Sequence, residues 1–147
     1  MVARQTTPAD PLASDRRPLV LCVDDETATL AALTRALRSE AYRFETTDDP
    51  ELAIDWVRTR TVSLILADYH MRGLSGTSLL QMVKAASPGT IRILLTGSAQ
   101  DPWIGVAEEK GLLRVFGKPW DDDALRKMIR DRLESGTSTG GGMYESR

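Results

Sequence analysis

Five side chains with useful chemistry each follow closely on an apolar stretch of the chain. They are Asp24, Asp25, Asp68, Thr96 and Lys118, the last of which directly follows Gly117. If the stretches are parallel strands of one sheet, their carboxyl ends meet at one edge, where α/β proteins bind ligands. Carboxylates, a hydroxyl and an ammonium at such an edge would form a site for Mg²⁺ and a phosphoryl group.

The elements that would position these residues alternate between strand and helix signals. Apolar or alternating stretches typical of strands lie at residues 19–23, 42–46, 62–67, 91–95 and 113–116. Helices are predicted at residues 27–39, 75–86 and 103–109. Two further helices are predicted to begin directly after the N-terminal caps Asp49 and Asp121. Five successive βα units predict an α/β fold. We expect a five-stranded parallel sheet of order 2-1-3-4-5 in a flavodoxin-like, doubly wound arrangement.

Length and composition set the broad class of the protein. The chain has 147 residues with 41% apolar content, which suits one folded domain. A net charge of -2, with acids and bases interspersed, gives no reason to expect direct binding to nucleic acid. There is no apolar N-terminal signal and no stretch of the about 20 apolar residues that spans a bilayer. We therefore expect a cytoplasmic location without membrane contact.

Composition also divides the chain into segments. Residues 1–18 are rich in Pro, Thr, Ser, Asp and Arg without periodicity, which predicts a disordered arm. Residues 135–147 begin with Ser-Gly-Thr-Ser-Thr-Gly-Gly-Gly, which is typical of a flexible tail. The folded domain is expected at residues 19–134. The single cysteine, Cys22, excludes an internal disulfide and is interpreted as a small core residue.

The predicted edge gives the polar residues distinct roles. Carboxylates that repel one another are tolerated when a hard cation lies among them, and Mg²⁺ prefers oxygen ligands. Asp68 follows a central strand and is the best candidate for the nucleophile that accepts a phosphoryl group. Thr96 supplies a hydroxyl donor, and Lys118 supplies a mobile positive charge that can reach a phosphoryl oxygen.

In its motifs the chain resembles the receiver domain of two-component response regulators. Each motif alone is common, but four of them in this order, each after an apolar stretch, are specific. The resemblance covers about residues 19–133. The matching stretches are Val23-Asp24-Asp25-Glu26, Leu66-Ala67-Asp68-Tyr69-His70-Met71 with Gly76, Leu95-Thr96-Gly97 and Gly117-Lys118-Pro119-Trp120.

The resemblance implies a phosphoacceptor signalling switch in a two-component phosphorelay. Asp68 would take a phosphoryl group from a phosphohistidine of a sensor histidine kinase, with Mg²⁺ bound beside it. Asp25 would ligate the Mg²⁺ directly and Asp24 mainly through water. Asp68 itself and the backbone carbonyl of His70 would be further ligands.

Other residues take roles from the same resemblance. Thr96 would hydrogen-bond the phosphoryl group. Ser98 follows Thr96 by two residues, and we expect it from this position to face the same pocket. Lys118 would pair first with Asp68 and then with the phosphate, and its peptide bond to the following proline is usually cis in the family. The chain would not be an enzyme beyond self-catalysed phosphotransfer and autodephosphorylation. The side chain of His70 is expected to modulate the loss of phosphate rather than to bind metal.

Three residues depart from the family pattern. Arg72 stands where the family often has a proline after the methionine. Val115 stands where the family usually has an aromatic switch residue, and Phe116 beside it should point to the other face of the strand. Trp120 replaces the commoner phenylalanine after Lys-Pro. Val115 therefore removes the usual coupling of a swinging aromatic ring to Thr96.

The expected partners are a sensor histidine kinase or a histidine phosphotransfer protein, and a downstream protein target. We expect the target to contact the fourth helix, fifth strand and fifth helix, and the chain to be a monomer or weak homodimer.

The alternative function is a receiver-like protein interaction module that is not phosphorylated, which Val115 and Arg72 favour. An aspartate-dependent phosphatase would need Asp-x-Asp where Glu26 stands. A flavin or nucleotide binder would need a glycine-rich phosphate loop after the first strand.

Overall fold

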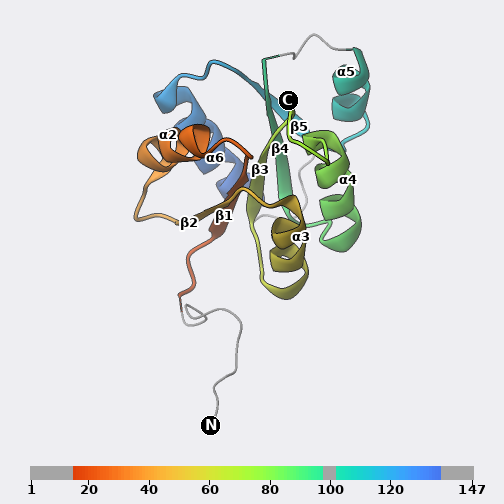
Figure 1. Ribbon diagram of the computed structural model, residues 1–147. Helices are drawn as coiled ribbons and strands as arrows, with labels where there is room; N and C mark the ends of the chain where they lie inside the picture. The colour runs from red at the N-terminus through yellow and green to blue at the C-terminus, as the bar shows by residue number, and fades with distance from the viewer. Residues whose placement is uncertain (1–14, 98–101, 137–147) are drawn as a thin grey trace.

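The structure, a computed structural model, describes residues 15–97 and 102–136. Its five strands form one parallel sheet in the order β2-β1-β3-β4-β5, which confirms the predicted α/β fold and strand order (Figure 1). The strand bounds differ from the predicted ones by no more than two residues. The strands are β1 (Leu19–Val23), β2 (Arg43–Thr47), β3 (Leu64–Asp68), β4 (Ile91–Thr96) and β5 (Arg114–Gly117).

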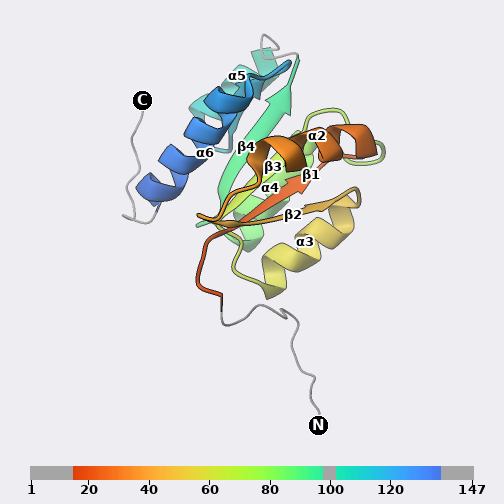
Figure 2. The same cartoon turned by 90° about the vertical axis from the view of Figure 1, so that its left-hand side faces the viewer.

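Helices cover both faces of the sheet, and Figure 2 shows α2 and α6 on the same side of it. One face carries α2 (Thr27–Leu37) and α6 (Asp122–Gly136). The other face carries α3 (Pro50–Thr59), α4 (Gly76–Ala86) and α5 (Pro102–Glu109). The last helix, α6, ends at Gly136. None of the described helices is long and apolar enough to cross a membrane.

The core consists of two apolar layers, one on each side of the sheet. β1 contributes to both, because its alternate residues point to opposite faces. Leu21 and Val23 pack in the layer under α3, α4 and α5. Val20 and Cys22 pack in the layer under α2 and α6. Every residue of β1 and β3 is buried, as expected for central strands that helices cover on both sides.

Short capped turns start the helices close to the carboxyl ends of the strands. The Asp49 side chain accepts a hydrogen bond from the Glu51 N–H at 2.9 Å, and Pro50 is the first residue of α3. The Asp121 carboxylate accepts one from the Ala124 N–H at 2.8 Å at the start of α6. Both predicted caps are confirmed.

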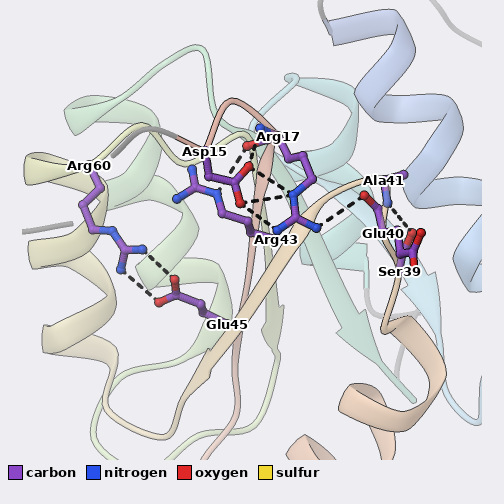
Figure 3. Close-up of polar contacts among 8 residues, drawn as sticks. All are labelled: Asp15, Arg17, Ser39, Glu40, Ala41, Arg43, Glu45 and Arg60. Carbon is purple, nitrogen blue, oxygen red and sulfur yellow. Dashed lines mark hydrogen bonds and ion pairs between the residues drawn. The ribbon is translucent and has the colours of Figure 1, made fainter. Parts of the chain in front are cut away.

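Polar contacts tie the edge strand β2 to its surroundings, as Figure 3 shows. At the start of the strand, the Arg43 Nε donates to the carbonyl oxygen of Arg17 at 3.3 Å, and Arg17 forms an ion pair of 2.6 Å with Asp15. Further along, the Glu45 carboxylate accepts two hydrogen bonds from Arg60, of 3.0 and 2.6 Å. The first contacts hold residues 15–17 to β2, and the last joins β2 to the end of α3.

Candidate functional site

The structure brings the predicted site residues together at the carboxyl edge of the sheet. Asp24 follows β1, Asp68 ends β3, Thr96 ends β4 and Lys118 follows β5. These four strands lie side by side. A pocket of about 530 Å³ opens at this edge. It is lined by Asp25, Glu26, Asp68, His70, Arg72 and Lys118.

Asp68 is held through both of its carboxylate oxygens. Oδ1 accepts from the ammonium group of Lys118, and Oδ2 accepts from the His70 N–H at 3.0 Å. Lys118 is itself positioned by its N–H, which donates to the Thr96 carbonyl oxygen at 2.9 Å. Its peptide bond to Pro119 is cis, as the resemblance implies. Asp68 is only 5% exposed, so the pocket presents its carboxylate in one fixed orientation.

Gly76 lets the first turn of α4 approach the end of β3. A Cβ atom at this position would overlap the carbonyl oxygen of Asp68 and crowd the side chain of Leu94. The Gly76 N–H donates to the carbonyl oxygen of Tyr69 at 3.1 Å, which joins the helix start to the loop after Asp68. This glycine, which the resemblance already singles out, therefore sets the shape of the loop beside the site.

Asp24 is the most deeply buried carboxylate at this edge, with 1% of the residue exposed. Its Oδ1 accepts from the Glu26 N–H at 2.9 Å, but its Oδ2 has no hydrogen-bond partner among the described residues. Burial, helped by the negative charges of Asp68 and Asp25, raises the pKa of Asp24 to about 6, although the hydrogen bond from the Glu26 N–H and the charge of Lys118 oppose the shift. A buried oxygen without a partner, beside two other carboxylates, suits a bound cation.

Asp25 lies nearer the rim of the pocket and is bound by Arg72. The Arg72 N–H donates to Asp25 Oδ2 at 2.8 Å, and Arg72 Nε lies 3.4 Å from the same oxygen. The sequence showed only that arginine replaces proline here and did not predict this contact. The sequence did contain one indication of the contact, because arginine supplies a backbone N–H and a positive charge that proline lacks.

The donor set agrees with a partly hydrated divalent ion. Within residues 15–97 and 102–136, no three Asp, Glu, His or Cys side chains are arranged to hold a metal ion by themselves. Mg²⁺ is usually held by one or two carboxylates, with water and carbonyl oxygens completing its octahedron. The Asp24 oxygen without a partner and the neighbouring carboxylates fit such a partly hydrated site better than a metal centre whose ligands all come from the protein.

The other two departures from the family pattern, Val115 and Trp120, pack on opposite sides of the sheet. Val115 packs partly buried against the layer under α3, α4 and α5, whereas Phe116 packs against the opposite layer, as predicted. Trp120 also packs against the α2 and α6 layer, and its indole N–H donates to Asp122 at 2.8 Å. No aromatic ring therefore lies at position 115. Ser98, predicted to face the same pocket, lies outside the described residues.

Known proteins with similar sequences include transcriptional regulatory proteins and a phosphotransferase. The hydrogenase transcriptional regulatory protein HoxA of Cupriavidus necator is 36% identical over 124 residues, which are 83% of this chain and 25% of HoxA. Sporulation initiation phosphotransferase F of Bacillus subtilis is 26% identical over 114 residues, which are 78% of this chain and 92% of that protein. The chain thus spans about a quarter of the length of HoxA and nearly all of the phosphotransferase.

Solved structures and a family model point the same way. The signal receiver domain of an HD domain-containing protein from Pseudomonas fluorescens is 33% identical, with a TM-score of 0.76 over 84% of this chain and 99% of that one. A CheY-like receiver domain protein from Methanospirillum hungatei is 25% identical, with the same TM-score and coverage. The family model for the response regulator receiver domain matches residues 20–130. The chain therefore belongs to the response regulator receiver domain family.

Proposed function

We propose that this chain is a phosphoacceptor switch of two-component signalling that is phosphorylated on Asp68 with Mg²⁺ bound. Receiver domains are signalling phosphoacceptors, and the family binds Mg²⁺ at its acidic phosphorylation site. The observation that carries the proposal is the setting of Asp68. Both of its oxygens are held, by Lys118 and by the His70 N–H, on a pocket that also contains Asp25.

In the proposed reaction, a carboxylate oxygen of Asp68 bonds to the phosphorus of a phosphohistidine, and the bond from phosphorus to the imidazole nitrogen breaks. Phosphoryl transfer depends mainly on positioning and on neutralising the phosphoryl oxygens. Lys118 already pairs with Asp68 and would supply positive charge to the product. The Thr96 hydroxyl, at the end of the neighbouring strand, would donate a hydrogen bond to a phosphoryl oxygen.

The acidic residues would hold the metal ion. Asp25, Asp68 and the His70 backbone carbonyl would ligate Mg²⁺ directly, and Asp24 would hold it mainly through water. The ion supplies positive charge next to the phosphoryl oxygens when it is bound. The buried Asp24 oxygen without a hydrogen-bond partner supports this assignment, since a cation would compensate it.

The proposed phosphoryl donor is a sensor histidine kinase or a histidine phosphotransfer protein. Sporulation initiation phosphotransferase F is by its name a phosphotransferase, which supports onward transfer from Asp68 to a second protein. We also propose self-catalysed loss of the phosphoryl group and output by protein contact through α5, β5 and α6. The protein would act as a monomer or weak homodimer.

A second candidate function is an interaction module that is not phosphorylated. Two observations favour it. Val115 leaves the usual aromatic position of β5 without a ring, so a change at Thr96 would not reach the surface by a swinging aromatic side chain. Arg72 also holds Asp25 in the absence of a metal ion. Under this function, the same surfaces would bind a partner without a phosphoryl signal.

Intact mass spectrometry tests the two functions. The wild type, Asp68→Asn and the matched control Asp55→Asn, which changes an exposed aspartate of α3, are incubated with Mg²⁺ and acetyl phosphate. We expect one added phosphoryl group on the wild type and on Asp55→Asn, none on Asp68→Asn, and loss of the addition with EDTA. Failure of the wild type with acetyl phosphate and with a partner kinase would favour the interaction module. Addition to Asp68→Asn would show that another residue is the acceptor.

A further inference from the structure

We propose that Arg72 is an internal counter-ion of Asp25 that competes with Mg²⁺ for this carboxylate. The inference rests on the proposed function, because it takes Asp25 to be a metal ligand. Its basis is that two donors of Arg72 reach one oxygen atom. The Arg72 N–H lies 2.8 Å and the guanidinium Nε lies 3.4 Å from Asp25 Oδ2.

The two donors of Arg72 differ in how they tolerate a metal ion. The backbone N–H is neutral, and a carboxylate that ligates a metal can still accept a hydrogen bond from it. The guanidinium carries a full positive charge, and a divalent ion bound to the same carboxylate would repel it at close range. Mg²⁺ binding therefore requires the Arg72 side chain to leave Asp25 while the backbone contact stays in place.

The exposure of Arg72 makes this exchange easy. Its side chain is 90% exposed, so it can swing into water without disturbing the core. An exposed ion pair contributes little to stability, which means that Mg²⁺ has only a small interaction to displace. Arg72 should consequently lower the affinity for Mg²⁺ by a modest factor rather than abolish binding.

Charge balance in the pocket gives Arg72 a function in the metal-free protein. Lys118 pairs with Asp68, and Arg72 pairs with Asp25, so each of these two carboxylates has its own cation. Without Arg72, Asp25 would stand beside two other carboxylates with no ion-pair partner of its own among the described residues. Arg72 thus keeps the pocket partly neutral until the divalent ion arrives, and it leaves when the ion takes its place.

Calorimetric Mg²⁺ titration of the full chain at low ionic strength tests the competition. Arg72→Gln keeps the backbone N–H and a side chain of similar reach but removes the charge. We expect it to bind Mg²⁺ about two- to fivefold more tightly than the wild type, the size expected for one exposed ion pair. Arg72→Lys keeps a charge and should fall between the two. The control Arg58→Gln removes the same charge from an exposed site on α3 and should match the wild type.

Two further measurements test the competition. The difference between Arg72→Gln and the wild type should shrink as ionic strength rises, because salt screens exposed charges. In nuclear magnetic resonance spectra, the Arg72 Nε–H signal should move on addition of Mg²⁺ to the position that it has in Asp25→Asn. A signal that stays unchanged at saturating Mg²⁺ would show that the side chain does not leave.

The outcomes distinguish this inference from the function beneath it. Equal or weaker Mg²⁺ binding by Arg72→Gln, with normal binding by the wild type, overturns the competition but leaves the proposed metal site intact. Absence of Mg²⁺ binding in the wild type and in Arg72→Gln, or unchanged binding in Asp25→Asn, overturns the metal site itself and the inference with it.

Discussion

Asp24 is buried beside two other carboxylates, and this placement has opposite consequences without and with a cation. An aspartate in an unfolded chain has a pKa near 4, whereas burial raises the pKa of Asp24 in the folded protein to about 6. In the folded metal-free protein, Asp24 therefore holds its proton more tightly than in the unfolded chain. The resulting stability is fully present below about pH 4 and is lost as the pH rises through about 6.

The Asp24→Asn variant should remove this loss. In EDTA at pH 7.5, we expect its free energy of unfolding to exceed that of the wild type by about 1–2 kcal/mol, with the difference vanishing near pH 4. Urea unfolding at both pH values measures this. Asp55→Asn, at an exposed site on α3, should show no such trend. Saturating Mg²⁺ should reverse the order, because the variant has lost a carboxylate that holds the ion. A pH-independent difference in EDTA would contradict the assignment.

Gly76 should tolerate no larger side chain. In Gly76→Ala the new methyl group would meet the Asp68 carbonyl oxygen, so α4 or the end of β3 must shift. We expect a loss of about 1–3 kcal/mol in the free energy of unfolding. Phosphorylation of Asp68 should also slow. Gly105→Ala is the matched control, because Gly105 lies in α5 with open space around a new Cβ.

The control carries its own expectation. Alanine is a better helix former than glycine, so Gly105→Ala should keep or raise stability by a few tenths to about 1 kcal/mol. Denaturant unfolding of both variants beside the wild type measures the contrast. If the two alanine variants lost the same stability, the close approach at Gly76 would not be the cause.

At the scale of elements, Arg92 of β4 joins two turns that are distant in sequence. Its guanidinium donates to four carbonyl oxygens of the chain segments before β4 and before β5. The acceptors are Pro88 at 3.2 Å, Thr90 at 2.8 Å, Gly111 at 3.3 Å and Leu112 at 2.7 Å. Burial lowers the pKa of Arg92, and no carboxylate accepts from it in these contacts. The side chain thus acts as a polar clamp between α4, β4 and the start of β5.

Arg92→Met should therefore loosen the connection between α5 and β5. Removing the donors leaves carbonyl groups without partners, which should cost about 1–3 kcal/mol in the free energy of unfolding. Amide hydrogen exchange should accelerate at residues 111–115 and stay unchanged in α2. Arg35→Met, at an exposed site on α2, should change neither quantity. Uniform acceleration over the whole sheet would instead indicate a general loss of stability.

The sequence predicted the elements better than the contacts between them. Apolar periodicity and caps such as Asp49 and Asp121 are local properties, so strand order and helix positions followed from them and from the rules for βα units. The carboxyl-edge cluster around Asp68 followed in the same way. The contacts of Arg72 with Asp25 and of Arg92 with two turns did not. They depend on how loops from different βα units meet, which no local pattern encodes.

At the scale of the whole molecule, the residues that stabilise the fold lie apart from those of the polar site. Its two apolar layers lie on the faces of the sheet, while the polar site lies at one edge, where the strands end. β1 lies in the interior of this arrangement, with β2 on one side and β3 on the other. Cys22, the only cysteine of the chain, sits on β1 and is fully buried. Its thiol can therefore report on opening of the whole domain.

Labelling of Cys22 should require global unfolding. Burial raises the pKa of the thiol, and the thiolate is the form that reacts with alkylating reagents. We expect iodoacetamide to label the native protein at a rate that gives the same free energy as urea unfolding, since a central strand opens only with the domain. Rapid labelling in the absence of denaturant would mean that β1 opens locally.

The same thiol can report ligand binding at the distant edge of the sheet. A ligand that binds only the folded state lowers the unfolded fraction by the factor 1 + [L]/Kd, so Mg²⁺ at ten times its Kd should slow labelling about elevenfold. The slowing should be lost in Asp25→Asn. It should appear at lower Mg²⁺ concentrations in Arg72→Gln, because that variant keeps Asp25 without its competing charge. A slowing of equal size in Asp25→Asn would mean that Mg²⁺ stabilises the fold from another place.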